Sequence, residues 1–245
     1  MAKTFYYSPS TPTITDGTIA SGTFTSSDSI VNEHRVNDDS IASAPTSINS
    51  NDAIRFDFGE AKTMDFMALY FTAGETDNVT VYDSDDGSAV TFNASRAATF
   101  NEGWTIISLT EESHRYWYIH FASAGTFDYL AEVIIGNKYE FDVEPDIGNT
   151  LGEEYGTDIM TSYGGQEYAN KRHEPKTTWD WNWSFVTASM KTSLESLNSS
   201  VQDHKKFVYY DETSYNYVRM TKPMAFNEVA YNVFSTSISL KEQLS

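Results

Sequence analysis

Short apolar segments that alternate with polar residues recur along the first half of this chain at a spacing of roughly ten residues. In one of them, Ile54 to Phe58, apolar side chains alternate with Arg55 and Asp57 before the segment ends at Gly59. Successive side chains of a strand point to opposite faces, so the pattern indicates a half-buried strand. Comparable segments lie at residues 64–72, 79–82, 103–109, 116–121 and 131–135. Short strands at this spacing predict an antiparallel β-sandwich.

The clearest alternation lies in the second half. Single polar residues separate Trp179, Trp181, Trp183 and Phe185, so these side chains are predicted to share one face of a strand. A helix is expected next, because apolar residues recur at helical spacing at Met190, Leu194, Leu197 and Val201. The helix needs an apolar partner, which favours a buried tryptophan face beneath it. The alternative is an exposed aromatic platform that stacks on sugar rings.

These patterns predict a mainly β protein with two antiparallel β-sandwich domains, the second carrying one α-helix. The polar character of the chain changes after Gly136, so we place the boundary there. Residues 1–137 form the first domain, with a polar N-terminal arm. Residues 138–245 form the second domain, with an extended hairpin, the helix and later strands at residues 207–210, 215–220 and 233–240.

Composition excludes several classes of protein. The chain has 35 acidic and 16 basic residues and a formal net charge of −19, which disfavours binding to nucleic acid or to an anionic membrane. It has no cysteine, so disulfides and thiolate sites are excluded. No apolar stretch is long enough for a transmembrane helix, and the N-terminus lacks the apolar core of a secretory signal. We therefore expect a protein that is made without export.

No pattern in the sequence predicts a catalytic, cofactor or metal site, and the chain is expected not to be an enzyme. His114 and His120 are six residues apart, on the same face of a strand but too far apart to share a metal ion. Asp83, Asp85 and Asp86 before Gly87 resemble part of a calcium loop but lack its final glutamate, so a turn is favoured. Whether the chain binds calcium elsewhere stays open.

Three segments of the first half share a framework pattern with a known family. They are Ile54–Gly59 followed by Thr63–Met67, then His114–Ile119, and finally Leu130–Gly136. In order and spacing they resemble framework strands of the discoidin, or F5/8 type C, family. The resemblance covers roughly residues 50–136 and implies a galactose-binding-like sandwich. The family's cysteines are missing, its ligand loops do not carry over, and sugar binding is an expectation by association.

The order of features in the second half is similar to that of tail-tube and distal-tail proteins of tailed phages. A glycine-rich polar stretch leads through Lys171-Arg172-His173 into the tryptophan-rich strand, and one short helix and further strands follow. The resemblance implies a ring-forming distal-tail or tail-tip subunit of the virion, made in the host cytoplasm, that links the tail tube to hub or fibre proteins. The alternative is a carbohydrate-binding adsorption or decoration protein of the virion.

The partners expected from this resemblance are copies of the chain, other tail proteins and, in the alternative, host surface glycans. No membrane is expected as a partner, and DNA would pass without adhering.

Residues 136–167 hold eight acidic residues, with Lys138 as the one basic residue among them. We predict that four of them face the lumen of a ring and repel DNA: Glu140, Asp142, Glu144 and Asp146. A solvated loop is the alternative. A basic cluster is predicted to contact a neighbouring subunit: Lys171, Arg172 and Lys176.

Overall fold

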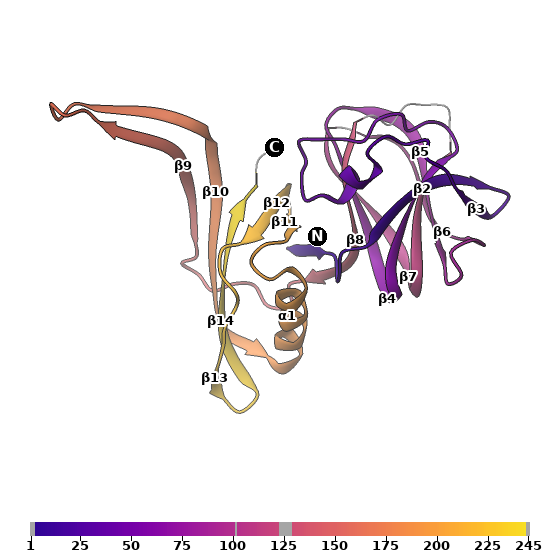
Figure 1. The fold of residues 1–245 in the computed structure, drawn as a ribbon. Helices are drawn as coiled ribbons and strands as arrows, with labels where there is room; N and C mark the ends of the chain where they lie inside the picture. Colours follow the sequence, from indigo (N-terminus) through magenta and orange to yellow (C-terminus); the bar gives the residue numbers. More distant parts are fainter. Residues whose placement is uncertain (1–2, 101, 123–128, 244–245) are drawn as a thin grey trace.

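The computed structural model describes residues 3–100, 102–122 and 129–243 (Figure 1). The first strands are β1 (Thr4–Tyr7), β2 (Thr13–Ala20), β3 (Thr23–Ser26), β4 (Asp52–Phe71), β5 (Glu75–Ser84), β6 (Thr91–Phe100), β7 (Gly103–Phe121) and β8 (Leu130–Glu140), with a short 3-10 helix at Glu33–Asn37. The later elements are β9 (Thr150–Thr161), β10 (Glu167–Thr187), α1 (Ala188–Val201), β11 (Lys206–Tyr210), β12 (Tyr215–Met220), β13 (Phe226–Ala230) and β14 (Val233–Glu242). Within these ranges the prediction of a mainly β protein with one α-helix is confirmed.

The first half folds around the long strand β4. This strand pairs antiparallel with β2, β7 and β8, while β5 lies between β6 and β7. Gly59 adopts a positive φ of 78° where the ladder with β7 is interrupted, and the Arg115 guanidinium donates two hydrogen bonds of 2.7 and 2.8 Å to Asp57 beside that break. The buried apolar cluster inside this half includes Phe56, Met67 and Trp117. The predicted sandwich therefore has a buried apolar core between its strands.

The second half is a sheet covered by the helix. Strands β1, β11, β12, β14, β10 and β9 follow one another in it, and α1 packs on the face that carries the tryptophans (Figure 1). The buried side chains of α1 are the four that the helical spacing predicted, and Thr187 Oγ1 caps the helix by accepting a hydrogen bond from the Met190 amide at 3.2 Å. The predicted helix and its buried stripe are confirmed.

The tryptophan strand differs from its prediction at one position. Trp179, Trp181 and Trp183 are buried, which confirms the core interpretation and excludes an exposed platform for them. Phe185 was expected on the same face, and this is wrong, because its side chain is 53% exposed. The register of β10 against β14 shifts between Trp183 and Val186, so Val186 takes the buried position. A β-bulge of this kind breaks the alternation that the sequence pattern assumes.

The two halves share a strand. Residues 130–136 of β8 pair with β4, and residues 137–140 pair with β1, which also pairs with β11. Residues 4–7 of the N-terminal arm therefore lie in the sheet of the second half. Where β8 passes from one half to the other, a Cβ on Gly136 would lie 2.0 Å from the Tyr7 carbonyl oxygen, so the two backbones approach closely.

No helix within the described ranges is long and apolar enough to cross a membrane.

Candidate functional site

The most exposed element of the fold is the hairpin formed by β9 and β10. Figure 1 shows it extending away from both halves. Among the described residues, strand β9 pairs with β10 alone, and β10 pairs with β14 only from Thr178 onward. One edge of β9 and the distal edge of β10, over residues 167–177, are therefore open in the part of the chain that the structure describes. Open edges of this length are templates for pairing with another strand.

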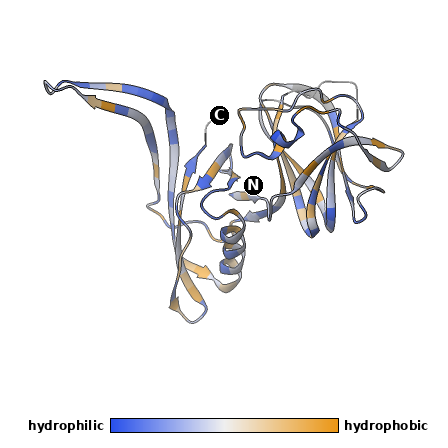
Figure 2. Ribbon diagram, viewed as in Figure 1, coloured by the Kyte–Doolittle hydropathy of each residue, from blue (hydrophilic) through white to orange (hydrophobic). Residues whose placement is uncertain are grey.

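An apolar stripe follows one face of the hairpin. Leu151, Tyr155 and Ile159 are four residues apart on β9, so their side chains point to the same side, and they are 69%, 66% and 64% exposed. Leu151 pairs with the buried Trp179, so this face continues the core face of the second half outward. On the opposite face Met160 pairs with Tyr168, and both are exposed. Figure 2 shows hydrophobic segments among hydrophilic ones along the hairpin.

The four acidic residues predicted to face a lumen lie at the base of the hairpin, not along its arms. Glu140 ends β8 and accepts from Lys138 at 2.9 Å, and Glu144 pairs with Lys3 at 2.5 Å. Asp146 accepts from the Ser184 amide at 2.7 Å, which fastens the connecting segment to β10. Asp142 is exposed between them. Their position toward a lumen stays a prediction, and three of the four already have partners in their own chain.

The three basic residues predicted to contact a neighbour lie on β10 within the hairpin. Lys171 and Arg172 are exposed, and they pair with Glu174 at 2.5 Å and with Asp158. Lys176 is half-buried where the hairpin meets the sheet. Lys171 pairs across the hairpin with Thr157 and so shares the face of the apolar stripe, whereas Arg172 contacts Asp158 on the other face. Contact of the basic cluster with another subunit stays a prediction.

A cleft with aromatic walls lies at the junction of the two halves. Tyr70 and Trp104 come from β4 and β7, and Tyr215 and Tyr217 come from β12. The Trp104 ring contacts Tyr70 and Tyr217 at centroid distances of 5.2 and 5.3 Å. Asn216 and Gln243 add polar groups to the same cleft. Amphipathic rings with nearby amides form a surface that suits a ligand with both apolar faces and hydroxyl groups.

Beside this junction lies a buried acid. Glu132 on β8 is 1% exposed and accepts a hydrogen bond from the Ser40 amide at 3.2 Å. Burial raises the pKa of Glu132 well above its ordinary value, and the nearby carboxylates of Asp38 and Asp39 act in the same direction. The Lys206 ammonium donates to the Asp39 carbonyl oxygen and places a positive charge at the cavity that Glu132 lines.

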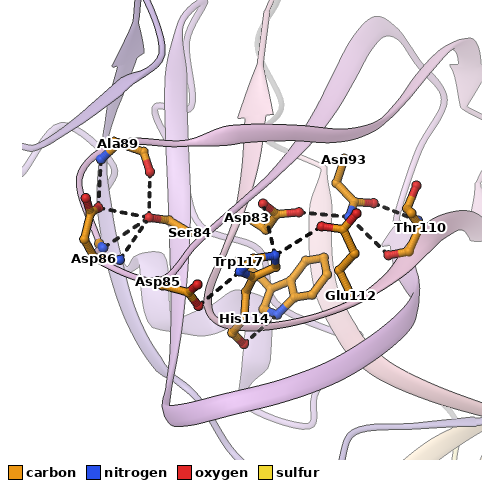
Figure 3. A network of polar contacts seen from close by, with 11 residues as sticks. Asp83, Ser84, Asp85, Asp86, Ala89, Asn93, Thr110, Glu112, His114 and Trp117 are labelled. Atoms are coloured by element: carbon orange, nitrogen blue, oxygen red, sulfur yellow. Dashed lines mark hydrogen bonds and ion pairs between the residues drawn. The ribbon is translucent and has the colours of Figure 1, made fainter.

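A polar network closes one end of the first half (Figure 3). His114 lies at its centre: Nδ1 is 3.0 Å from Asp85 Oδ1, and Nε2 is 3.1 Å from Glu112 Oε2 and 3.7 Å from Asp83 Oδ1. Burial alone would lower the pKa of His114, but hydrogen bonds with Glu112 and Asp85 and the charge of Asp83 together raise it. The three ligand atoms of Asp83, Glu112 and His114 lie within 4.8 Å of one another, close enough to hold a metal ion.

One expectation about this region needs correction. His114 and His120 do not share a face: His114 contacts Asp83, whereas the His120 ring lies 5.8 Å from that of Tyr82, the preceding residue of β5. Asp83 and Tyr82 are neighbours on β5 and point to opposite faces, so the two histidines that contact them lie on opposite faces. His120 is buried. The turn at Asp85–Gly87 is confirmed, since Asp86 accepts from the Ser88 and Ala89 amides at 2.8 and 2.9 Å.

Comparisons with known proteins give structural relatives only. No protein-family model matches the chain, and no curated protein matches it. Chitosan-binding module 1 of a chitosanase/glucanase from Paenibacillus sp. IK-5 is 19% identical, with 54% of this chain and 100% of that chain covered and a TM-score of 0.42. CpGH89CBM32-5 from Clostridium perfringens, solved with GalNAc-β-1,3-galactose, is 9% identical, with 51% and 94% covered and a TM-score of 0.42.

A third similar structure is the CBM32 of AlyQ in complex with 4,5-unsaturated mannuronic acid. It is 18% identical, with 54% of this chain and 96% of that chain covered and a TM-score of 0.40. These three structures are carbohydrate-binding modules. The interpretation of the second half as a tail domain stays a prediction.

Proposed function

We propose that this chain is a structural subunit that assembles with copies of itself through the β9–β10 hairpin. The observation that carries the proposal is the hairpin itself, with two open edges and exposed apolar side chains on both faces. An isolated two-stranded ribbon is marginally stable in water, and its exposed edges favour pairing with another chain.

A second copy of the chain is the partner that the hairpin fits best. The open edge of β9 and the open distal edge of β10 are different surfaces of one element, so each copy can offer β9 to the β10 of the next. Such a head-to-tail contact forms a ring when the rotation between copies closes.

The finer form of this proposal is a ring in the tail of a phage virion, with the first half displayed outside it. The tail-ring form of the proposal is supported by the order of elements in the second half, where the hairpin is followed by the helix and then by further strands. The net charge of −19 repels copies from one another, so assembly is expected to strengthen with moderate salt as screening shortens the repulsion to about 8–10 Å.

Sedimentation velocity tests the assembly. Wild type is compared with a variant in which Leu151, Tyr155 and Ile159 are changed to Ser. The matched control changes Phe92 and Tyr231 to Ser, because these exposed side chains lie outside the hairpin. Oligomers in wild type and control but monomers in the hairpin variant support the proposal. A wild type that stays monomeric at micromolar concentration and moderate salt contradicts it.

A second candidate function is carbohydrate binding, and the aromatic cleft at the junction favours it. Tyr70 and Trp104 present half-buried rings beside the amides of Asn216 and Gln243, a combination that suits the apolar faces and hydroxyl groups of a sugar. The names of the similar structures include chitosan, GalNAc-β-1,3-galactose and a mannuronic acid, and these sugars define the first probes.

A glycan array followed by calorimetry tests this second function. Trp104→Ala and Asn216→Ala are expected to weaken binding of any glycan found, and Phe92→Ala, an exposed ring away from the cleft, is expected to leave it unchanged. Binding that survives both cleft variants would place the sugar elsewhere, and an array without a hit would remove the function. These outcomes are independent of whether the hairpin assembles.

A further inference from the structure

The network at one end of the first half has the dimensions of a metal site. Donor atoms around a tetrahedral ion with bonds of about 2.1 Å lie about 3.4 Å from each other. His114 Nε2 lies 3.1 Å from Glu112 Oε2 and 3.7 Å from Asp83 Oδ1, on either side of that value. We propose that Asp83, Glu112 and His114 bind a divalent transition metal ion of the Zn²⁺ class.

The carboxylate of Asp83 is an independent sign of a missing ligand. Its side chain is 1% exposed, and Oδ1 is buried without a hydrogen-bond partner in the described part of the chain. A buried carboxylate oxygen without a donor costs free energy. Figure 3 shows this oxygen directed toward His114 and Glu112. A metal ion bound between the three side chains gives Asp83 Oδ1 the positively charged partner that it lacks among the described residues.

Neighbouring groups hold the three ligands in place. Asn93 donates to Asp83 Oδ2 at 2.9 Å and is itself fixed because its Oδ1 accepts from the Thr110 amide at 2.8 Å. Asp85 Oδ1 lies 3.0 Å from His114 Nδ1, so it can hold the proton on that nitrogen and leave Nε2 free for the ion. The Trp117 indole donates to the His114 carbonyl oxygen at 3.2 Å. A carboxylate that orients a histidine in this way is typical of metal centres.

The donor set selects the kind of ion. One imidazole and two carboxylates suit Zn²⁺ and similar ions, and three protein ligands leave a fourth position for water. Calcium and magnesium take more oxygen ligands and disfavour an imidazole nitrogen. The site joins β5 to β7, because Asp83 lies on the first strand and the other two ligands on the second. Its occupation is expected to stabilise this end of the sandwich.

Isothermal titration of the full chain with Zn²⁺, Ca²⁺ and Mg²⁺ tests the site. We expect one Zn²⁺ per chain, a higher melting temperature with Zn²⁺, and no comparable effect of Ca²⁺ or Mg²⁺. The absence of Zn²⁺ binding, or tighter binding of Ca²⁺ at this position, overturns the proposal.

Variants assign the ligands. Glu112→Gln and His114→Gln are expected to abolish tight binding, and Asp85→Asn, which acts through His114, to weaken it by about 10–100-fold. Glu112 is half-exposed, so its variant is expected to fold even where Asp83→Asn does not. The control is His204→Gln, because His204 is an exposed histidine beside an aspartate outside the network. Zn²⁺ binding that is equal in His114→Gln and wild type, or lost only in the control, contradicts the site.

Discussion

A single carboxylate, Asp65, is expected to make part of the folding stability depend on pH. Burial raises the pKa of Asp65 from its ordinary value of 3.8 to about 6, although the Lys138 amide donates to it at 3.0 Å. As the pH rises from about 4 to about 6, the unfolded chain releases this proton before the folded chain does, so stability falls over this window and stays lower above it. Asp65→Asn removes the penalty, because an amide oxygen can still accept from Lys138.

Thermal melts of Asp65→Asn and wild type at pH 4 and pH 7.5 test this expectation. The variant should melt higher than wild type at pH 7.5 and close to wild type at pH 4. Asp28→Asn serves as the control, since Asp28 is an exposed carboxylate that is not among the groups that shift the pKa of Asp65. Equal melting temperatures of wild type and Asp65→Asn at pH 7.5 would show that Asp65 carries no such penalty.

At the scale of elements, β10 offers a comparison within one strand. Trp181 is buried, and its ring lies 4.9 Å from Tyr209 and 5.8 Å from Phe141, whereas Phe185 is 53% exposed beyond the bulge. Trp181→Ala is expected to lower the free energy of unfolding by about 3–5 kcal/mol, and Phe185→Ala to change it by less than about 0.5 kcal/mol. Chemical denaturation measures both. Similar losses in the two variants would contradict the placement of the bulge.

Strand β10 and the helix α1 that follows it show how far the sequence predicts this fold. The helical spacing of Met190 to Val201 and the alternation at Trp179 to Trp183 are local patterns, and both predicted buried faces correctly. The bulge at Phe185 depends on pairing with β14, a later strand, so alternation alone could not place it. The His114 network needs the pairing of β5 with β7. Its local signals are the aspartates at Asp83 and Asp85 and the Glu112 two residues before His114, and such acidic groupings are too common in an acidic chain to be specific.

At the scale of the whole molecule, the two halves share β8 and each has a core cluster of its own, while a third buried cluster joins Phe66 and Ile134 of the first half to Val208 of the second. The core cluster of the first half draws its buried members from residues 30–135, and that of the second half includes Phe5 and Phe141 to Leu240. We expect a fragment of residues 12–137 to fold alone, because it keeps this first core and omits β1, whose partner β11 it lacks. Amide NMR tests this: dispersed resonances support it, and a spectrum collapsed to random-coil positions contradicts the boundary near Gly136.

The assembly of whole molecules rests on contacts between hairpin edges, and the absence of cysteine allows a direct test. One chain carries Thr157→Cys on β9, and a second chain carries a cysteine at Glu167, Ala169 or Lys171 on β10, positions that share the face of Thr157. All four positions are exposed, and the two cysteines are on different molecules, so a disulfide between them reports contact between copies.

The account predicts that mild oxidation of the mixture gives mixed dimers at one or two of the three β10 positions. It also predicts that a cysteine at Phe92, exposed outside the hairpin, gives none. Mixed dimers that form equally with the Phe92 cysteine, or fail to form at every hairpin position while the wild-type oligomer is present, would contradict assembly through the hairpin.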